Sequence, residues 1–270
     1  MTEWLVHFTR YNPPFHPREV LSKILTEGVL RPGFALRGHP AKSTIYGPFP
    51  AVCFSEQPLA MFIQYLAARA DWAAMAGYGL LIHKHDLYAA GGLPVIYGLG
   101  ARELERGDDG YDPSRRLLDP THISLYEQYR YVAFAPNRKP YPLDWSHERE
   151  WRWPSYSGGP LELGHEYRST STGEFLARLH AFVEYDVDIP WLQGEIQRAL
   201  EIDAAGKISE NSYYHLWWRP RLAEIFVISL ETIGRELQVG RTEFSRFEDL
   251  PSEYRASLIV RRKEIPSRPE

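Results

Sequence analysis

The stretch Trp145–Trp153 (WSHEREWRW) alternates charged and bulky aromatic residues with a period of two. This period is typical of a strand whose two faces meet different surroundings. The two predicted faces consist of Glu148, Glu150 and Arg152, and of Arg149, Trp151 and Trp153. We expect the tryptophan face to be buried and the carboxylate face to line a cleft with Glu150 at its chemical centre. A half-solvated edge strand is the alternative interpretation of the same pattern.

The composition is that of an ordered globular protein with ample core, because 44% of the 270 residues are hydrophobic and 14% are aromatic. The net charge of −4 excludes a basic field over the whole molecule, although a local basic groove for nucleic acid stays open. Cys53 is the single cysteine, so an intrachain disulfide is excluded. The chain starts in a strand-like segment and charges interrupt its apolar runs. We therefore expect no signal peptide, no membrane span and a cytoplasmic location.

Strands and helices are expected to mix without a regular βαβ order, which indicates an α+β fold. The predicted strands are 4–9, 51–55, 79–84, 93–97, 149–153, 222–229 and 257–261. The predicted helices are 17–27, 58–69, 122–134, 175–182, 191–202, 210–218 and 231–238. Residues 35–50 form a polar loop long enough to act as a lid. No linker stands out, so a single domain over residues 1–270 is predicted, with an insertion allowed at about 155–220.

Several short motifs place polar groups at or beside predicted strands. In chain order they are HFT (7–9), ILTEG (24–28), CFSEQPL (53–59), YG (78–79), PVIY (94–97) and EREWR (148–152). This order resembles the ADP-ribosyltransferase-like superfamily over roughly residues 4 to 153. Within that superfamily the chain is most similar to the DarT-type DNA ADP-ribosyltransferases and the AbiGi-type abortive phage-resistance proteins.

The resemblance implies a split, curved mixed sheet with flanking helices that grips NAD in a cleft between its halves. It also implies an NAD-dependent ADP-ribosyltransferase or NAD glycohydrolase, in phage defence or in a toxin–antitoxin pair with a cognate partner. Nucleic acid, protein and water all remain open as the acceptor. The residues that the resemblance places around the nicotinamide ribose are His7, Phe8 and Thr9 in the first strand, Phe54 and Ser55 in the second, and Glu150.

The chemistry of the nicotinamide–ribose bond fits these assignments. Cleavage of this bond builds an oxocarbenium-like transition state, whose charge the carboxylate of Glu150 can stabilise while it holds the 2′-hydroxyl. Glu148 can position or deprotonate the acceptor. The other candidate contacts are His7 and Thr9 to ribose hydroxyls, Phe54 or Tyr97 to the nicotinamide ring, and Arg10 or Arg152 to the pyrophosphate.

The same residues allow other interpretations. His147-Glu148 lacks the second histidine of a zinc-protease motif, and no metal site is predicted. Glu224 competes with Glu150, because DarT-like enzymes carry their catalytic glutamate in an "AE" strand. A non-catalytic antitoxin or binding partner with the same fold is the alternative function. An RNA 2′-phosphotransferase-like enzyme is a third, although its Arg-His-x-Arg set is not found.

Overall fold

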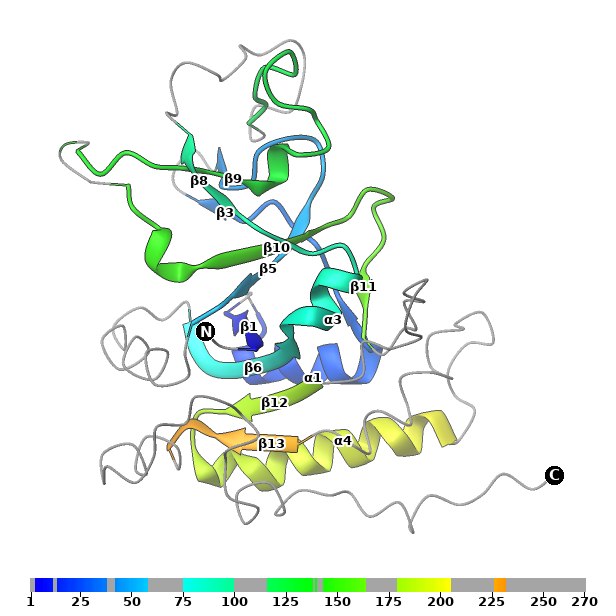
Figure 1. Cartoon of the computed structure of the whole chain (residues 1–270). Coiled ribbons are helices and arrows are strands. Elements are labelled where there is room, and N and C mark those ends of the chain that lie inside the picture. Colours follow the sequence, from blue (N-terminus) through cyan, green and yellow to red (C-terminus); the bar gives the residue numbers. More distant parts are fainter. Residues whose placement is uncertain are drawn as a thin grey trace. The chain divides into compact units, whose positions relative to one another are not determined.

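The computed structural model describes residues 3–11, 14–37, 42–57, 75–99, 116–137, 139, 143–163, 179–204 and 226–231. These residues form helices and mainly antiparallel strands, so the predicted α+β class is confirmed (Figure 1). The chain divides into two compact units, each of which is described by itself. Unit 1 comprises Met1–Val29, Gln57–Asp86 and Glu162–Glu270, and unit 2 comprises Leu30–Glu56 and Leu87–Leu161.

Four strands form the sheet of unit 1 in the order β13-β12-β6-β1. Their bounds are β1 Trp4–Arg10, β6 Met75–His83, β12 Leu179–Val183 and β13 Phe226–Ser229. β6 pairs antiparallel with both β1 and β12, whereas β12 and β13 run parallel. Helix 175–182 was wrongly predicted, since Leu179–Val183 is a strand that is buried along its whole length. An apolar run buried on both faces lacks the alternation that marks a strand in sequence.

Helix α1 (Pro17–Glu27) has the bounds that the sequence predicts, because both ends carry strong local signals. Pro17 occupies the first turn, where its missing N–H costs no hydrogen bond. His16 and Glu19 form a reciprocal capping box at the N-terminus. Gly28 ends the helix in the left-handed conformation, with φ of 68°, and its N–H donates to the carbonyl of Ile24.

The second long helix of unit 1 is α4 (Ile189–Ala204), which confirms the predicted helix 191–202. It follows the 3₁₀ turn η3 (Asp186–Asp188). The hydroxyl of Tyr78 in β6 donates to Asp188 at 2.7 Å, which ties the start of α4 to the sheet. Burial and the Asp188 carboxylate hold the pKa of Tyr78 far above its ordinary value, so this tyrosine remains a hydrogen-bond donor.

Unit 2 is built on three antiparallel strands in the order β5-β10-β7. They are β5 (Ala51–Ser55), β10 (Glu150–Pro154) and β7 (Leu93–Pro94). Two further pairs complete the unit: β3 (Leu36–Arg37) with β4 (Lys42–Ser43), and β8 (Ile96–Leu99) parallel to β9 (Tyr131–Ala133). Three short elements lie where the chain passes between the units: β2 (Val29–Leu30), α3 (Lys84–Ala89) and β11 (Leu161–Glu162).

Two predictions in unit 2 are wrong. Residues 122–134 are not a helix but turns, the 3₁₀ helix η1 (Gln128–Arg130) and strand β9. The buried side-chain amide of Gln128 accounts for the absence of a helix here. It accepts the N–H of Leu118 and donates to the Leu118 carbonyl, which stabilises a compact loop. Residues 35–50 are not a simple polar loop either. Ile45 and Tyr46 are fully buried, and Ile45 packs with Ala51 and Tyr129 in a hydrophobic cluster.

Several predicted elements lie outside the described residues. They are the helices 58–69 and 210–218, most of the helix 231–238, the strand 257–261 and the first part of the strand 222–229. Glu224 is among them. Among the described residues, none of the helices combines the length and the apolar character that a membrane crossing requires.

The glycine of the YG motif gives the first testable prediction. A Cβ atom at Gly79 would lie 2.1 Å from the carbonyl oxygen of His7 and 2.6 Å from the ring of Phe182. We expect Gly79→Ala to lower the free energy of unfolding by roughly 1–3 kcal/mol or more, because a packed sheet cannot make room for it. Urea denaturation measures this difference.

Gly33→Ala is the matched control for Gly79→Ala. No heavy atom lies within 4 Å of a Cβ built at Gly33, so its unfolding free energy should change by less than about 0.5 kcal/mol. Equal effects of the two substitutions would contradict the close approach of β1 to β6.

Candidate functional site

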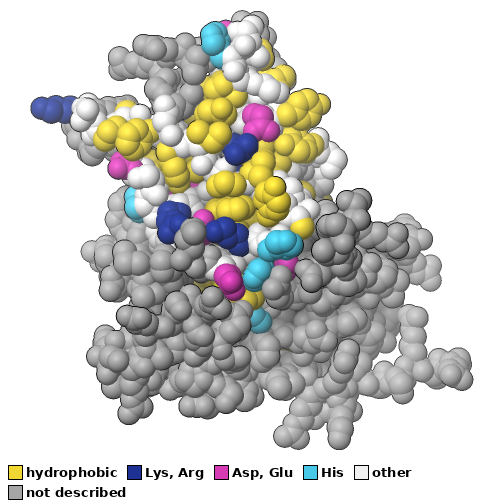
Figure 2. Space-filling view, in the orientation of Figure 1, with side chains coloured by type: hydrophobic (Ala, Val, Ile, Leu, Met, Phe, Trp, Pro, Cys, Tyr) yellow, Lys and Arg dark blue, Asp and Glu magenta, His cyan; other side chains and the backbone are white. Residues whose placement is uncertain are grey.

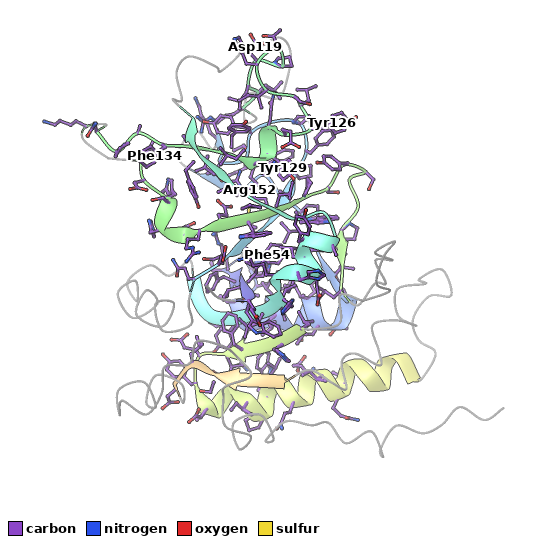
Figure 3. The ribbon with its side chains drawn as sticks, viewed as in Figure 1. Phe54, Asp119, Tyr126, Tyr129, Phe134 and Arg152 are labelled. Carbon is purple, nitrogen blue, oxygen red and sulfur yellow. The ribbon has the colours of Figure 1, made fainter. Side chains whose placement is uncertain are left out.

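The candidate site of unit 2 is built around an ion pair between Glu150 and Arg152 in β10. Figure 3 labels Arg152. The register aligns Glu150 with Ser55 and Arg152 with Cys53 of β5, so these four residues share one face of the sheet. Trp151 lies opposite Phe54, on the other face. The structure therefore shows the two-faced strand over these positions, with acid and base on the face opposite the tryptophans.

Arg152 is an interior residue of unit 2, with only 2% of its surface exposed. Its Nε and Nη2 donate to the two carboxylate oxygens of Glu150 at 3.0 and 3.1 Å. Its Nη1 donates to the carbonyls of Tyr129 and Tyr131 at 2.6 and 3.4 Å. Burial alone would lower the pKa of this guanidinium, but the Glu150 carboxylate reverses the effect and the pKa is raised. The arginine thus remains a cation and fixes the orientation of Glu150.

The predicted pairing of Arg152 with a pyrophosphate stays a prediction. The guanidinium is buried and its donors are directed at Glu150 and at two backbone carbonyls. The predicted stacking of Phe54 on a nicotinamide ring also stays a prediction; this side chain is 2% exposed and belongs to the core. An alternation with a period of two assigns residues to the two faces of a strand. It does not indicate which of these faces other elements cover.

Tyr97 contacts Glu150 through the backbone. Its hydroxyl oxygen accepts the N–H of Glu150 at 2.8 Å. Burial raises the pKa of the Tyr97 hydroxyl to about 12, and the carboxylates of Glu150 and Glu148 act in the same direction. The phenol therefore keeps its proton at physiological pH, and its O–H remains a donor beside Glu150. Stacking of Tyr97 on a ligand stays a prediction.

Glu148 does not share a strand face with Glu150, in contrast to the prediction. Ser146–Glu148 forms the 3₁₀ turn η2, and β10 begins only at Glu150. Asp144 starts this turn by accepting hydrogen bonds from the N–H and the hydroxyl of Ser146, which also lower its pKa. Ser55 then holds the end of the turn, since its hydroxyl donates to the carbonyl of Glu148 at 2.6 Å.

Arg149 joins this turn to the strand in the left-handed conformation, with φ of 46° and ψ of 51°. Non-glycine residues rarely adopt it, at a cost of roughly 1–2 kcal/mol. Because of this conformation, Arg149 does not follow the alternation of side chains between the two faces of β10. Its side chain is 43% exposed, whereas the sequence placed it on the buried tryptophan face.

Glu56, in the CFSEQPL motif, is a functional candidate that the sequence pattern did not indicate. It is buried, and one carboxylate oxygen accepts the indole N–H of Trp151 at 2.9 Å. The other oxygen lies 3.5 Å from the Arg149 guanidinium, and the Glu56 N–H donates to the Arg149 carbonyl. A buried acid directly after a strand is the signal that could have drawn attention to it.

The predicted residues of β1 belong to unit 1. Thr9 is 1% exposed and its hydroxyl donates to the carbonyl of Tyr78, and its predicted bond to a ribose stays a prediction. Phe8 is half-buried and meets Phe182 edge to face, while Arg10 is exposed. His7 is half-buried, and its contact with a ribose stays a prediction.

Unit 2 also exposes a group of aromatic side chains. Figure 2 shows hydrophobic side chains gathered over the part of the molecule that carries β3, β8 and β9. Phe49, Tyr126 and Tyr156 form one cluster, with ring centroids 5.0 to 5.5 Å apart. The hydroxyl of Tyr156 donates to the carbonyl of Tyr126, which holds the exposed rings in place.

A scan against models of known families, a search of curated proteins and a search of solved structures each gave no match. The activity must therefore be argued from the site itself. Within the part of the chain that the structure describes, no group of three or more His, Cys, Asp or Glu side chains is arranged to hold a metal ion.

The hydroxyl of Tyr97 gives the second prediction. Tyr97→Phe removes the acceptor of the Glu150 N–H at the first residue of β10. We expect the unfolding free energy to fall by about 1 kcal/mol, the net contribution of one hydrogen bond. Chemical denaturation measures the loss.

Tyr126→Phe is the control for Tyr97→Phe, since Tyr126 is an exposed tyrosine of the same unit, and its substitution should be nearly neutral. An equally small effect at Tyr97 would show that this hydroxyl does not anchor the strand.

Proposed function

We propose that the chain is an NAD-dependent ADP-ribosyltransferase or NAD glycohydrolase in which Glu150 is the key carboxylate. One observation carries this proposal: the Glu150 side chain is 14% exposed and both its oxygens are oriented by the buried guanidinium of Arg152. A carboxylate held in this way cannot reorient as charge develops on a substrate. Electrostatic stabilisation of a transition state depends on such prior orientation.

The proposed reaction starts with cleavage of the bond between C1′ of the ribose and the nicotinamide nitrogen. Nicotinamide leaves as a neutral molecule with the bonding electron pair, and positive charge develops on C1′ and the ring oxygen. Glu150 stabilises this charge through its negative oxygens. The lone pair of an acceptor then forms the new bond to C1′, and Glu148 or solvent removes the acceptor proton.

The motif strands support this assignment within unit 2. The CFSEQPL and EREWR strands are neighbours, and the pair Glu150–Ser55 stands at the end of their ladder. The Ser55 hydroxyl donates to the Glu148 carbonyl, and the Tyr97 hydroxyl accepts the N–H of Glu150. Both hydroxyl groups therefore lie beside the backbone around Glu150. We further propose that the fold is the split, curved sheet of the ADP-ribosyltransferase-like superfamily. His7 is then a ribose contact, and phage defence or a toxin–antitoxin pair is the biological setting.

A second candidate is a non-catalytic binding partner with the same fold. The same ion pair favours it, because the cation of Arg152 reduces the field that Glu150 exerts on a substrate. Under this alternative the pair is structural, and NAD is neither cleaved nor bound.

Incubation with NAD labelled in the nicotinamide and in the adenosine part tests the two candidates. The first candidate predicts release of labelled nicotinamide by the wild-type chain. The destination of the adenosine label, on DNA, RNA, protein or in free ADP-ribose, identifies the acceptor. Absence of both nicotinamide release and NAD binding would favour the non-catalytic partner.

Glu150→Gln gives the third prediction. The amide keeps the shape and one acceptor for Arg152 but removes the negative charge. Nicotinamide release should fall by ~10²-fold or more, while NAD affinity changes little because the ground-state ribose is not cationic. Initial rates and equilibrium binding, compared on folded protein, are the measurements, because loss of the carboxylate also destabilises unit 2.

Glu127→Gln is the matched control for Glu150→Gln, since Glu127 is a half-exposed carboxylate of unit 2 that pairs with Arg130. Its substitution should leave the rate unchanged. Full activity of Glu150→Gln would remove Glu150 from the reaction and direct attention to Glu224.

A further inference from the structure

The backbone of Glu150 is held by the segment that joins β7 to β8. Glu150 is the first residue of β10 and follows Arg149, which has a positive φ. Its carbonyl accepts the N–H of Val95 at 3.0 Å, and its N–H donates to the hydroxyl oxygen of Tyr97 at 2.8 Å. The phenol of Tyr97 thus supplies the acceptor that a backbone carbonyl supplies in a regular ladder.

Arg152 and Tyr97 restrain different parts of Glu150. The guanidinium of Arg152 bonds both carboxylate oxygens and so fixes the side chain relative to its own strand. Tyr97 bonds the main chain from β8 and fixes the point at which β10 begins. A carboxylate moves with the backbone that carries it. The position of the Glu150 carboxylate in unit 2 therefore depends on both contacts.

The charge state of Tyr97 suits this contact. Burial raises the pKa of its hydroxyl to about 12, and the carboxylates of Glu150 and Glu148 raise it further. The phenol is therefore neutral at physiological pH and adds no third negative charge beside the two carboxylates. An ionised acceptor in its place would repel both acids.

From these contacts we infer that Tyr97 is a positioning residue for Glu150, which acts on the rate through the backbone of that glutamate. The inference rests on the proposed function and adds a residue that determines where the key carboxylate lies. Electrostatic stabilisation depends on the exact placement of the stabilising group, and a displacement of about 1 Å costs up to ~10²-fold in rate. The displacement matters only when charge develops on the substrate, so its effect belongs to kcat.

Steady-state release of nicotinamide from NAD by the full-length Tyr97→Phe variant tests the inference. The substitution removes one oxygen atom, and the variant should stay folded because the loss of a single hydrogen bond is small against the stability of a domain. We expect kcat per folded molecule to fall roughly 10-fold or more. KM and the Kd of NAD, from titration calorimetry, should stay nearly constant.

Trp153→Phe is the matched control, because Trp153 lies in the same strand and also makes a side-chain hydrogen bond. Its indole N–H donates to the carbonyl of Ala90 at 2.8 Å. The substitution should lower the unfolding free energy, as Tyr97→Phe does, but should leave kcat of the folded enzyme unchanged. Urea denaturation gives the folded fraction of each variant.

A fall of kcat in Tyr97→Phe alone, with KM unchanged, supports the positioning role. Wild-type kcat in folded Tyr97→Phe would overturn the inference and leave the proposed function intact. Equal losses of kcat in Tyr97→Phe and Trp153→Phe would also overturn it, because they would reduce the role of Tyr97 to stability. Absence of nicotinamide release by the wild-type chain would overturn the proposed function together with the inference.

Discussion

The bidentate contact between Arg152 and Glu150 is the interaction on which the architecture of unit 2 depends. It fixes the first residue of β10, and through the two carbonyls of Tyr129 and Tyr131 it ties that strand to η1 and β9. A guanidinium that is 2% exposed has no water to replace a lost partner. Removal of the carboxylate would therefore leave an uncompensated buried charge, at a cost of roughly 3–5 kcal/mol.

The ion pair with Arg152 also determines which chemical role Glu150 can fill. A carboxylate oriented from behind is suited to stabilise positive charge in front of it, since no reorganisation is needed during the reaction. Its partially compensated charge, however, also suits a purely structural role. The turn before β10 adds a strained residue of the kind that occurs at functional sites, because Arg149 adopts the left-handed conformation and its half-exposed guanidinium lies beside Glu56.

The sequence predicts those elements whose signals are local. Helix α1 follows from Pro17 and Gly28, and strand β5 from its apolar run before Ser55. The register of β5 and β10 also agrees with the predicted faces at Glu150, Trp151 and Arg152. Elements determined by distant partners are not predicted. Strand β12 is buried on both faces, and the loop around Gln128 is stabilised by contacts with Leu118. The burial of Phe54 and Arg152 depends on elements that cover the sheet, which no local pattern records.

A double-mutant cycle between Glu150 and Arg152 tests the central claim most directly. The unfolding free energies of the wild type, Glu150→Gln, Arg152→Met and the double variant give the coupling energy of the pair. The account predicts a coupling of about 2 kcal/mol or more, because each single variant strands a buried partner while the double variant does not. Additivity of the two single effects to within about 0.5 kcal/mol would show that the pair does not organise this unit.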